Sequence, residues 1–423
     1  MNHNRKNTSQ RRSFLKKSVA GLLGLMSYPA LAETVSHNEF SRSIVGKSDD
    51  DIFALVRKQL LLDSNIVYMN TGSLGPSPRM VVDKINEAMH QLERNPVTEN
   101  WGPLGKEMEA VREKAANFFN ADIDEIILTR NTTEGLSLVG STLKLSEGDE
   151  ILTTTNEHGG AEVGLDYMAK KNGAVINKIE MPMPAESAKQ IVDLIRKNIT
   201  SKTKVLLLSH VSTITGLRMP IEEIAKITKD KDILFIVDGA QAPGMLAIDV
   251  KKLGADVYAT SGHKWLLGPK ETGIVYMRKS VQERIDPVFL SSGNASYSAS
   301  SGTRNVANFI GLGETISWHQ VINSDKIEAR VLELSAYCRE LLKGIEGVEI
   351  ISPEEKSLTS AMVSVRLLET KNRDVFYAMR ENNIVIKVLP KNNALRFSTH
   401  MFNTHEDIKK LVEQLNTLLN QSD

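Results

Sequence analysis

Strand-like and helix-like patterns alternate through the middle of the chain, from about Glu125 to Met277, and this alternation constrains the fold most strongly. Short apolar runs such as 233–237 and 257–260 predict buried strands. Amphipathic segments between such runs, including 160–171 and the proline-started 221–229, predict helices. Strands that alternate with helices in this way form mostly parallel sheets covered on both faces. We therefore expect an α/β fold with helices on both faces of a mostly parallel sheet.

The last third of the chain has a different pattern. A long helix is predicted near 326–343, followed by short strands at 361–367 and 394–398 and a closing helix at 405–419. This pattern predicts a smaller α+β domain over 311–423, beside a large domain over 81–310. Residues 33–80 are expected to form an N-terminal arm that contributes to the small domain.

The first residues differ in kind from the rest. Arg11-Arg12 precede Phe14, an apolar stretch follows over 18–28, and Ala30-Leu31-Ala32 ends the segment. A basic start, a short apolar core and an A-x-A end are typical of a cleaved signal peptide, and the paired arginines resemble a twin-arginine signal. We expect residues 1–32 to be removed after Ala32 and the mature chain to be periplasmic. The alternative is an uncleaved basic membrane anchor.

Removal of this segment changes the charge balance. Residues 1–32 contain six Lys or Arg and no acidic residue, which leaves 46 basic and 52 acidic residues and a net charge of −6. An acidic mature chain does not favour nucleic-acid binding, and no second stretch is long and apolar enough for membrane insertion. The single cysteine, Cys338, excludes an intrachain disulfide. Export of an already folded chain by the twin-arginine machinery requires no disulfide and permits loading of a cytoplasmic cofactor.

Two polar segments directly follow predicted strands and predict the chemistry. Asp238 and Gln241 follow one strand, and Ser261, His263 and Lys264 follow the next. In α/β sheets such strand ends meet at the ligand-binding edge. A nucleophilic lysine and an aspartate that can pair with a ring nitrogen together indicate a pyridoxal 5′-phosphate site. Lys264 is expected to form the Schiff base and then act as a base near the substrate Cα, although a surface lysine is the simpler alternative.

Other residues are expected to complete the cofactor site. Thr132 and Thr133 open a helix after a strand, so backbone N–H groups and hydroxyls can bind the phosphate together with Ser261 and His263. Gln241 could donate to the phenolic oxygen of the cofactor. His158 follows another strand and could stack on the ring. Ordinary helix caps are the alternative for the threonines and for His158.

These motifs resemble the class V aminotransferases among the fold-type I pyridoxal phosphate enzymes, over about Asn65 to the C-terminus. The resemblance rests on Asn-Thr-Thr-Glu at 131–134, Glu-His at 157–158, Asp-Gly-Ala-Gln at 238–241 and Ser-Gly-His-Lys at 261–264. It implies a seven-stranded sheet and a homodimer in which Gly302 and Thr303 contact the phosphate of the neighbouring subunit. It also implies that Arg396 binds the substrate carboxylate.

Departures from the family pattern indicate which branch of the family this chain resembles most. Cysteine desulfurases and selenocysteine lyases carry a cysteine on a loop near the arginine strand, whereas 387–396 contains none, and Cys338 lies in a helical pattern typical of packing. The segments 70–75 and 210–220 look more like the isopenicillin-N-epimerase-like branch. That resemblance places Gly72 and Ser73 against the substrate, although a plain turn is the alternative for this segment.

The sequence thus predicts a periplasmic, dimeric enzyme acting at Cα of an amino acid or of an amino-acid-bearing peptide or secondary metabolite. Epimerisation and transamination both remain open, because they share removal of the Cα proton by Lys264. The alternative enzyme is a desulfurase or selenocysteine lyase that cleaves C–S or C–Se bonds. A cofactor-binding fold without catalysis and a structural envelope protein are the non-enzymatic alternatives.

Overall fold

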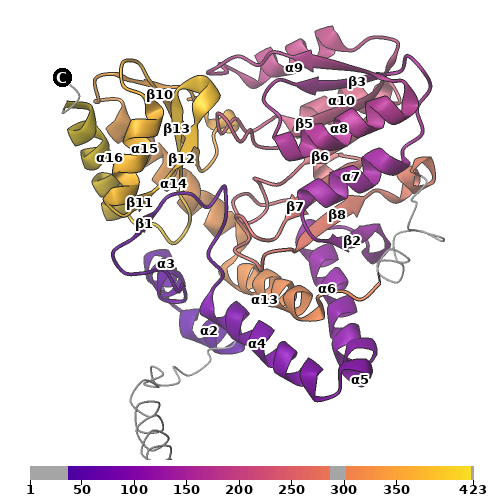
Figure 1. Ribbon diagram of the computed structural model, residues 1–423, viewed down its shortest axis with the longest axis horizontal. Coiled ribbons are helices and arrows are strands. Elements are labelled where there is room, and N and C mark those ends of the chain that lie inside the picture. The colour runs from indigo at the N-terminus through magenta and orange to yellow at the C-terminus, as the bar shows by residue number, and fades with distance from the viewer. Residues whose placement is uncertain (1–36, 286–301, 421–423) are drawn as a thin grey trace, which may run out of the picture.

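The computed structural model describes residues 37–285 and 302–420 (Figure 1). The predicted signal peptide and its cleavage site lie outside the described residues. Within the described ranges, no helix combines the length and the apolarity needed to cross a bilayer.

Helices and strands alternate as the sequence predicts through the middle of the chain. The helices are α2 (His37–Ile44), α3 (Asp49–Lys58), α4 (Arg79–Arg94), α5 (Pro96–Trp101), α6 (Pro103–Phe119), α7 (Thr132–Thr142), α8 (Gly159–Asn172), α9 (Ala188–Asn198), α10 (Ile221–Asp230), α11 (Val250–Leu253), α13 (Val306–Ile322), α14 (Ser324–Leu342), α15 (Asn372–Glu381) and α16 (His405–Asn420). Short 3₁₀ turns occur at η1 (Ile123–Glu125), η2 (Lys279–Arg284), η3 (Lys356–Leu358) and η4 (Pro390–Asn392).

A seven-stranded sheet forms the centre of the large domain. Its strand order is β2 (Ile126–Thr129), β8 (Gly273–Met277), β7 (Val257–Ser261), β6 (Leu234–Asp238), β5 (Thr203–Ser209), β3 (Glu150–Thr154) and β4 (Val175–Ile179). Only β8 runs antiparallel to its neighbours. The expected α/β fold with a mostly parallel sheet is confirmed.

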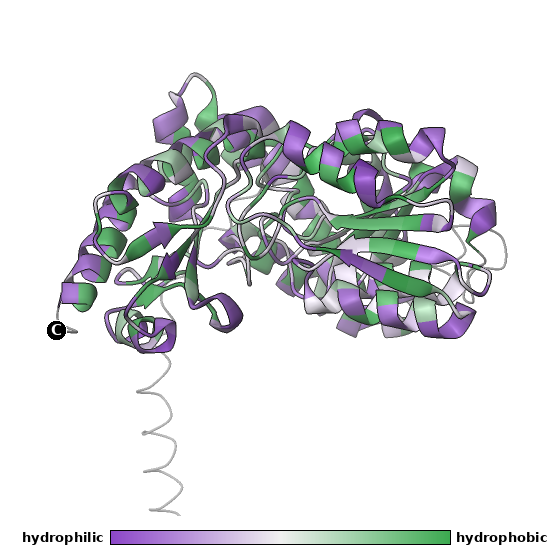
Figure 2. Cartoon of the chain, turned by 90° about the horizontal axis from the view of Figure 1, so that it is seen from above, coloured by the Kyte–Doolittle hydropathy of each residue, from purple (hydrophilic) through white to green (hydrophobic). Residues whose placement is uncertain are grey.

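Strand residues alternate between two apolar layers. In β6, Leu234 and Ile236 join the core beneath α7 and α8, whereas Phe235 and Val237 join the core formed with α6, α9, α10 and α13. Figure 2 shows the helices above and below the large sheet. Both faces of the strands are therefore buried, which explains why they read as continuous apolar runs.

The smaller domain is built on an antiparallel sheet of four strands. Their order is β12 (Lys387–Leu389), β13 (Ala394–Ser398), β10 (Met362–Leu367) and β9 (Val348–Ile350). Helices α14, α15 and α16 pack with this sheet, and its core includes the fully buried Cys338. The expected packing role of that cysteine is confirmed.

The N-terminal segment contacts both domains. Strand β1 (Val67–Tyr68) pairs in parallel with β11 (Ile384–Val385) of the small domain. Phe40 in α2 packs on Trp318 in α13, with ring centroids 5.9 Å apart. Helix α13 continues through the expected boundary between residues 310 and 311, and it packs against α4 and α6.

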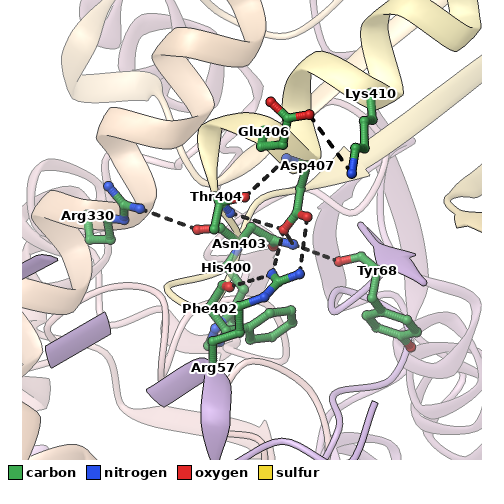
Figure 3. Close-up of polar contacts among 10 residues, drawn as sticks. All are labelled: Arg57, Tyr68, Arg330, His400, Phe402, Asn403, Thr404, Glu406, Asp407 and Lys410. Carbon is green, nitrogen blue, oxygen red and sulfur yellow. Dashed lines mark hydrogen bonds and ion pairs between the residues drawn. The ribbon is translucent and has the colours of Figure 1, made fainter. Parts of the chain in front are cut away.

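Polar contacts fix the segment after β13 to this arm (Figure 3). Arg57 in α3 donates to the carbonyl of Phe402 at 3.0 Å and pairs with the carboxylate of Asp407 at 2.7 Å. Asn403 donates to the carbonyl of Tyr68 at 3.1 Å. These contacts hold the segment after β13 against α3 and β1.

Candidate active site

The predicted site residues lie along the carboxyl edge of the large sheet. Strand β6 ends at Asp238 and β7 ends at Ser261, while β5 ends at Ser209, directly beside Asp238 in the register. Ligands of open α/β sheets bind at this edge. The placement expected from the sequence is therefore the one observed.

The start of α7 and the end of β7 form an anion-binding corner. The backbone N–H of Thr132 donates to the Ser261 hydroxyl at 3.0 Å, and the two hydroxyl oxygens lie 2.8 Å apart. Asn131 caps the helix by accepting from the N–H of Glu134 at 2.9 Å. A helix N-terminus that presents two hydroxyls suits a phosphate. Thr133 is exposed at the same turn.

His263 lies next to this corner and is half-buried. Burial and the charges of Lys264 and Lys270 lower the pKa of its imidazole to about 4. The ring is therefore neutral at neutral pH and can offer one N–H to an anion.

Lys264 has the properties that a nucleophilic amine requires. Burial is the main cause that lowers its pKa to about 8; the negative charge of Asp238 opposes this shift, and the positive charges of Arg396 and Lys387 add to it. Its amine has no hydrogen-bond partner among the described residues. A substantial fraction of this amine is neutral at slightly alkaline pH, which favours attack on an aldehyde and acceptance of a proton.

Asp238 is buried at the end of β6. Its carboxylate accepts the N–H of Ala240 at 2.9 Å. Burial raises the pKa of this carboxyl, and the charge of Lys264 opposes the increase. A buried carboxylate of this kind can hold a proton on a pyridine nitrogen.

Gln241 connects the sheet edge to the segment after β1. Its amide donates to the carbonyl of Gly72 at 2.8 Å and accepts from the indole N–H of Trp265 at 2.7 Å. A second N–H of the amide remains for the expected contact with the cofactor oxygen. The N–H of Gly75 also donates to the carbonyl of His263 at 2.7 Å. The 70–75 turn is thus fixed over the site.

His158 caps α8, which is the alternative that the sequence left open. Its Nδ1 accepts the N–H of Gly160 at 3.0 Å, and the side chain is exposed. Burial of part of the ring and the charge of Lys264 lower its pKa, and Asp238 opposes them. The cap therefore holds the imidazole close enough to Lys264 and Asp238 for their charges to affect its pKa. Stacking on the cofactor remains a prediction.

Arg396 is fully buried in β13 with an incomplete set of partners. Its Nη1 donates to the carbonyl and hydroxyl oxygens of Thr213 at 2.8 and 2.7 Å, and its Nη2 donates to the Ser73 hydroxyl at 3.3 Å. Its Nε is buried without a partner. Buried donors are rarely left unpaired. Because Nε and Nη2 form one edge of the guanidinium, this edge fits a carboxylate bidentately.

Gly72 lies where a side chain would not fit. A Cβ at this position would lie 2.9 Å from Nη2 of Arg396 and 3.1 Å from both Oε1 of Gln241 and Oγ of Ser398. The backbone at Gly72 therefore lies close to Arg396, Gln241 and Ser398, and Ser73 contacts Arg396 as described above. The approach of Gly72 and Ser73 to a substrate remains a prediction.

Gly302 and Thr303 are exposed and do not join the site within one chain. The neighbouring Arg304 donates to the carbonyl of Leu128. The predicted contact with a second subunit therefore remains a prediction.

Three residues near the site were not predicted. Glu157 is buried between Thr154 and Ser209, whose hydroxyls each donate to it at 2.6 Å. Burial raises the pKa of its carboxyl to about 7. Thr213 holds Arg396, and Lys387 lies opposite Arg396 in β12. The Glu-His pair at 157–158 was the sequence signal for Glu157, and Thr213 lay in a segment noted for its resemblance, but neither Thr213 nor Lys387 was assigned a role from the sequence.

The donor set fits pyridoxal 5′-phosphate. Thr132, Ser261 and the start of α7 can bind the phosphate, Asp238 the ring nitrogen and Lys264 the aldehyde. The buried Nε of Arg396 has no partner in the described part of the chain, which leaves a donor that a carboxylate could pair with.

Comparison with known proteins agrees with this geometry. The family Aminotransferase class-V matches residues 67–411. An isopenicillin N epimerase from Amycolatopsis lactamdurans is 28% identical over 392 residues, which cover 86% of this chain and 98% of the relative. A probable cysteine desulfurase from Halalkalibacterium halodurans is 29% identical over 383 residues, which cover 83% and 93% of the two chains.

A solved structure shares the fold. The apo cysteine desulfurase from Thermococcus onnurineus NA1 superimposes with a TM-score of 0.78 at 26% identity, covering 86% of this chain and 98% of that one. With the family match extending over most of its length, the chain belongs to the class V aminotransferase family of pyridoxal phosphate enzymes.

Proposed function

We propose that this protein uses pyridoxal 5′-phosphate, held on Lys264, to act at Cα of an amino acid or of an amino-acid-bearing peptide or secondary metabolite. One observation carries the proposal. The Lys264 amine, with its pKa lowered to about 8, lies within the electrostatic range of both the buried Asp238 and Arg396. A nucleophile, a ring-nitrogen partner and a carboxylate-binding group therefore occur together.

Each residue has a distinct role in this reaction. When bound, the cofactor supplies a ring that accepts electrons from Cα. Arg396 binds the substrate carboxylate through Nε and Nη2, which fixes Cα relative to Lys264. Once the substrate amine had displaced it from the cofactor, Lys264 would be free to accept the Cα proton, while Asp238 would keep a proton on the ring nitrogen. Return of this proton to the opposite face of Cα would give epimerisation, and its delivery to the cofactor carbon would give transamination.

The alternative of a cysteine-dependent desulfurase has less support. The turn between β12 and β13 is only the short η4, and it contains no cysteine. Cys338 lies in the small-domain core, where burial raises the pKa of its thiol to about 12. A thiol in this environment is a poor nucleophile. Sulfide release from cysteine that disappears in Cys338→Ala would favour the lyase.

Assembly and location complete the proposal. We infer a homodimer in which the exposed Gly302 and Thr303 contact the phosphate of the second subunit. We also infer export of the folded chain through the twin-arginine machinery to the periplasm. Substitution of Arg11 and Arg12 by lysine should retain the precursor in the cytoplasm, and normal export of this variant would refute the proposed signal.

Borohydride reduction followed by peptide mass mapping tests the central assignment. The purified holoprotein should carry the cofactor on Lys264, and Lys264→Ala should lose the yellow absorbance. Attachment to another lysine would overturn the site. Deuterium exchange at Cα, measured over a panel of D- and L-amino acids, then tests the chemistry and reports the substrate.

A further inference from the structure

Lys387 lies on the same face of the small sheet as Arg396. In the antiparallel register of β12 and β13, Lys387 is directly opposite Arg396. Opposite residues on neighbouring strands project from the same face, with their Cβ atoms about 5 Å apart. The next pair, Val388 and Leu395, faces the small-domain core instead. The alternation therefore places Lys387 on the active-site face.

A row of polar side chains crosses this face from its buried end to its open end. Ser364 in β10 is opposite Arg396 on the other side and donates to the carbonyl of Ile214 at 2.6 Å. Arg396 is covered by Thr213 and Ser73, as described above. Lys387 is exposed at the outer end of the row. A substrate bound through Arg396 could therefore extend toward Lys387.

The ammonium of Lys387 has no acidic partner among the described residues. Burial, which is the larger cause, and the positive charge of Arg396 both lower the pKa of Lys387. The positive charge of Lys387 in turn lowers the pKa values of Lys264 and His158. Neighbouring cations repel one another unless an anion lies between them. The unpaired ammonium and the unpaired Nε of Arg396 are thus two sites for negative groups on one face.

We infer that Lys387 binds a carboxylate on the substrate side chain while Arg396 binds the α-carboxylate. The substrate class is then a dicarboxylic amino acid, free or as the reacting residue of a larger metabolite. The inference rests on the proposed function, because it assigns the α-carboxylate to Arg396.

Glutarate and its monoamide provide a matched pair of ligands, because they differ only in the charge of one end. Calorimetric binding to the holoprotein should show glutarate to be about tenfold tighter, as expected for one charge-assisted contact. Lys387→Gln should abolish this preference and leave the affinity for the monoamide essentially unchanged. Lys387→Arg should retain the preference, because it keeps the positive charge.

Lys391 in the adjacent turn provides the control, because Lys391→Gln removes the same charge from the same hairpin. This variant should keep the preference for glutarate. Equal affinities in the wild type, survival of the preference in Lys387→Gln or its loss in Lys391→Gln would each overturn the inference. These outcomes are separate from failure of the proposed function, which borohydride mapping of Lys264 on the same preparation would reveal.

Discussion

Thr213 holds the guanidinium of Arg396 with two oxygen atoms, its carbonyl at 2.8 Å and its hydroxyl at 2.7 Å from Nη1. Both contacts are on the same nitrogen. They therefore orient the side chain, while among the described residues Nε has no partner and Nη2 has only the 3.3 Å contact with Ser73. Thr213 is thus a positioning residue for Arg396.

Replacement of Thr213 by valine should weaken carboxylate binding without abolishing it. Valine keeps the shape of threonine but removes one acceptor, and the backbone carbonyl still holds Nη1. We expect KM for the amino-acid substrate to rise about fivefold, corresponding to ~1 kcal/mol, with little change in kcat. Steady-state kinetics would test this against Thr417→Val, at the end of α16. A decrease in kcat at unchanged KM would contradict a positioning role.

A methyl group at Gly72 should disturb the same site from the opposite side. The added Cβ would lie 2.9 Å from Nη2 of Arg396 and 3.1 Å from Oε1 of Gln241. Gly72→Ala should therefore raise KM by about tenfold or more while the cofactor absorbance is retained. Gly344→Ala is a suitable control, because the atom closest to its added Cβ would be the Leu341 carbonyl oxygen at 3.9 Å. Unchanged kinetics in Gly72→Ala would show that the turn is free to move.

The sequence predicted those parts of the site that depend on local order along the chain. Asp238, Ser261 and Lys264 each follow a strand, so the parallel sheet brings them to one edge without further information. The helix-cap role of His158 could also be predicted from local sequence, because the residue directly precedes α8.

Other parts depend on tertiary register and could not be predicted. Lys387 faces the site only because it is opposite Arg396 across a hairpin whose exact pairing no pattern fixes. Thr213 reaches Arg396 across 183 positions of the chain. The raised pKa of Glu157 arises from its burial, beside Ser209 on a neighbouring strand. Side-chain partners of this kind are set by packing rather than by local propensity.

Incorporation of the cofactor should depend on the ionisation of Lys264. Only the neutral amine attacks an aldehyde, and burial lowers the pKa of this amine to about 8. The rate at which the apoprotein binds pyridoxal phosphate should therefore rise with pH and level off above about 8. Absorbance measured after rapid mixing would show this dependence.

Asp238→Asn tests whether the ionisation of Lys264 sets this pH dependence, because the negative charge of Asp238 raises the pKa of Lys264. The midpoint of the pH profile should move to lower pH in this variant. A wild-type midpoint near 10.5, the ordinary value for lysine, would mean that the amine is not desolvated.

Glu157 should make the stability of the protein depend on pH. The pKa of its buried carboxyl is raised from 4.5 to about 7, so the folded chain keeps a proton that the unfolded chain releases between these values. Its contribution to stability is therefore complete below about pH 4.5 and is lost as pH rises through about 7. Glu157→Gln stays neutral, so its stability relative to the wild type should increase between pH 4.5 and 7, by about 3 kcal/mol in total at pH 8. Urea unfolding at pH 5, 6, 7 and 8, with the exposed Glu369→Gln as control, measures the difference; a constant difference at all four values would show that Glu157 does not titrate there.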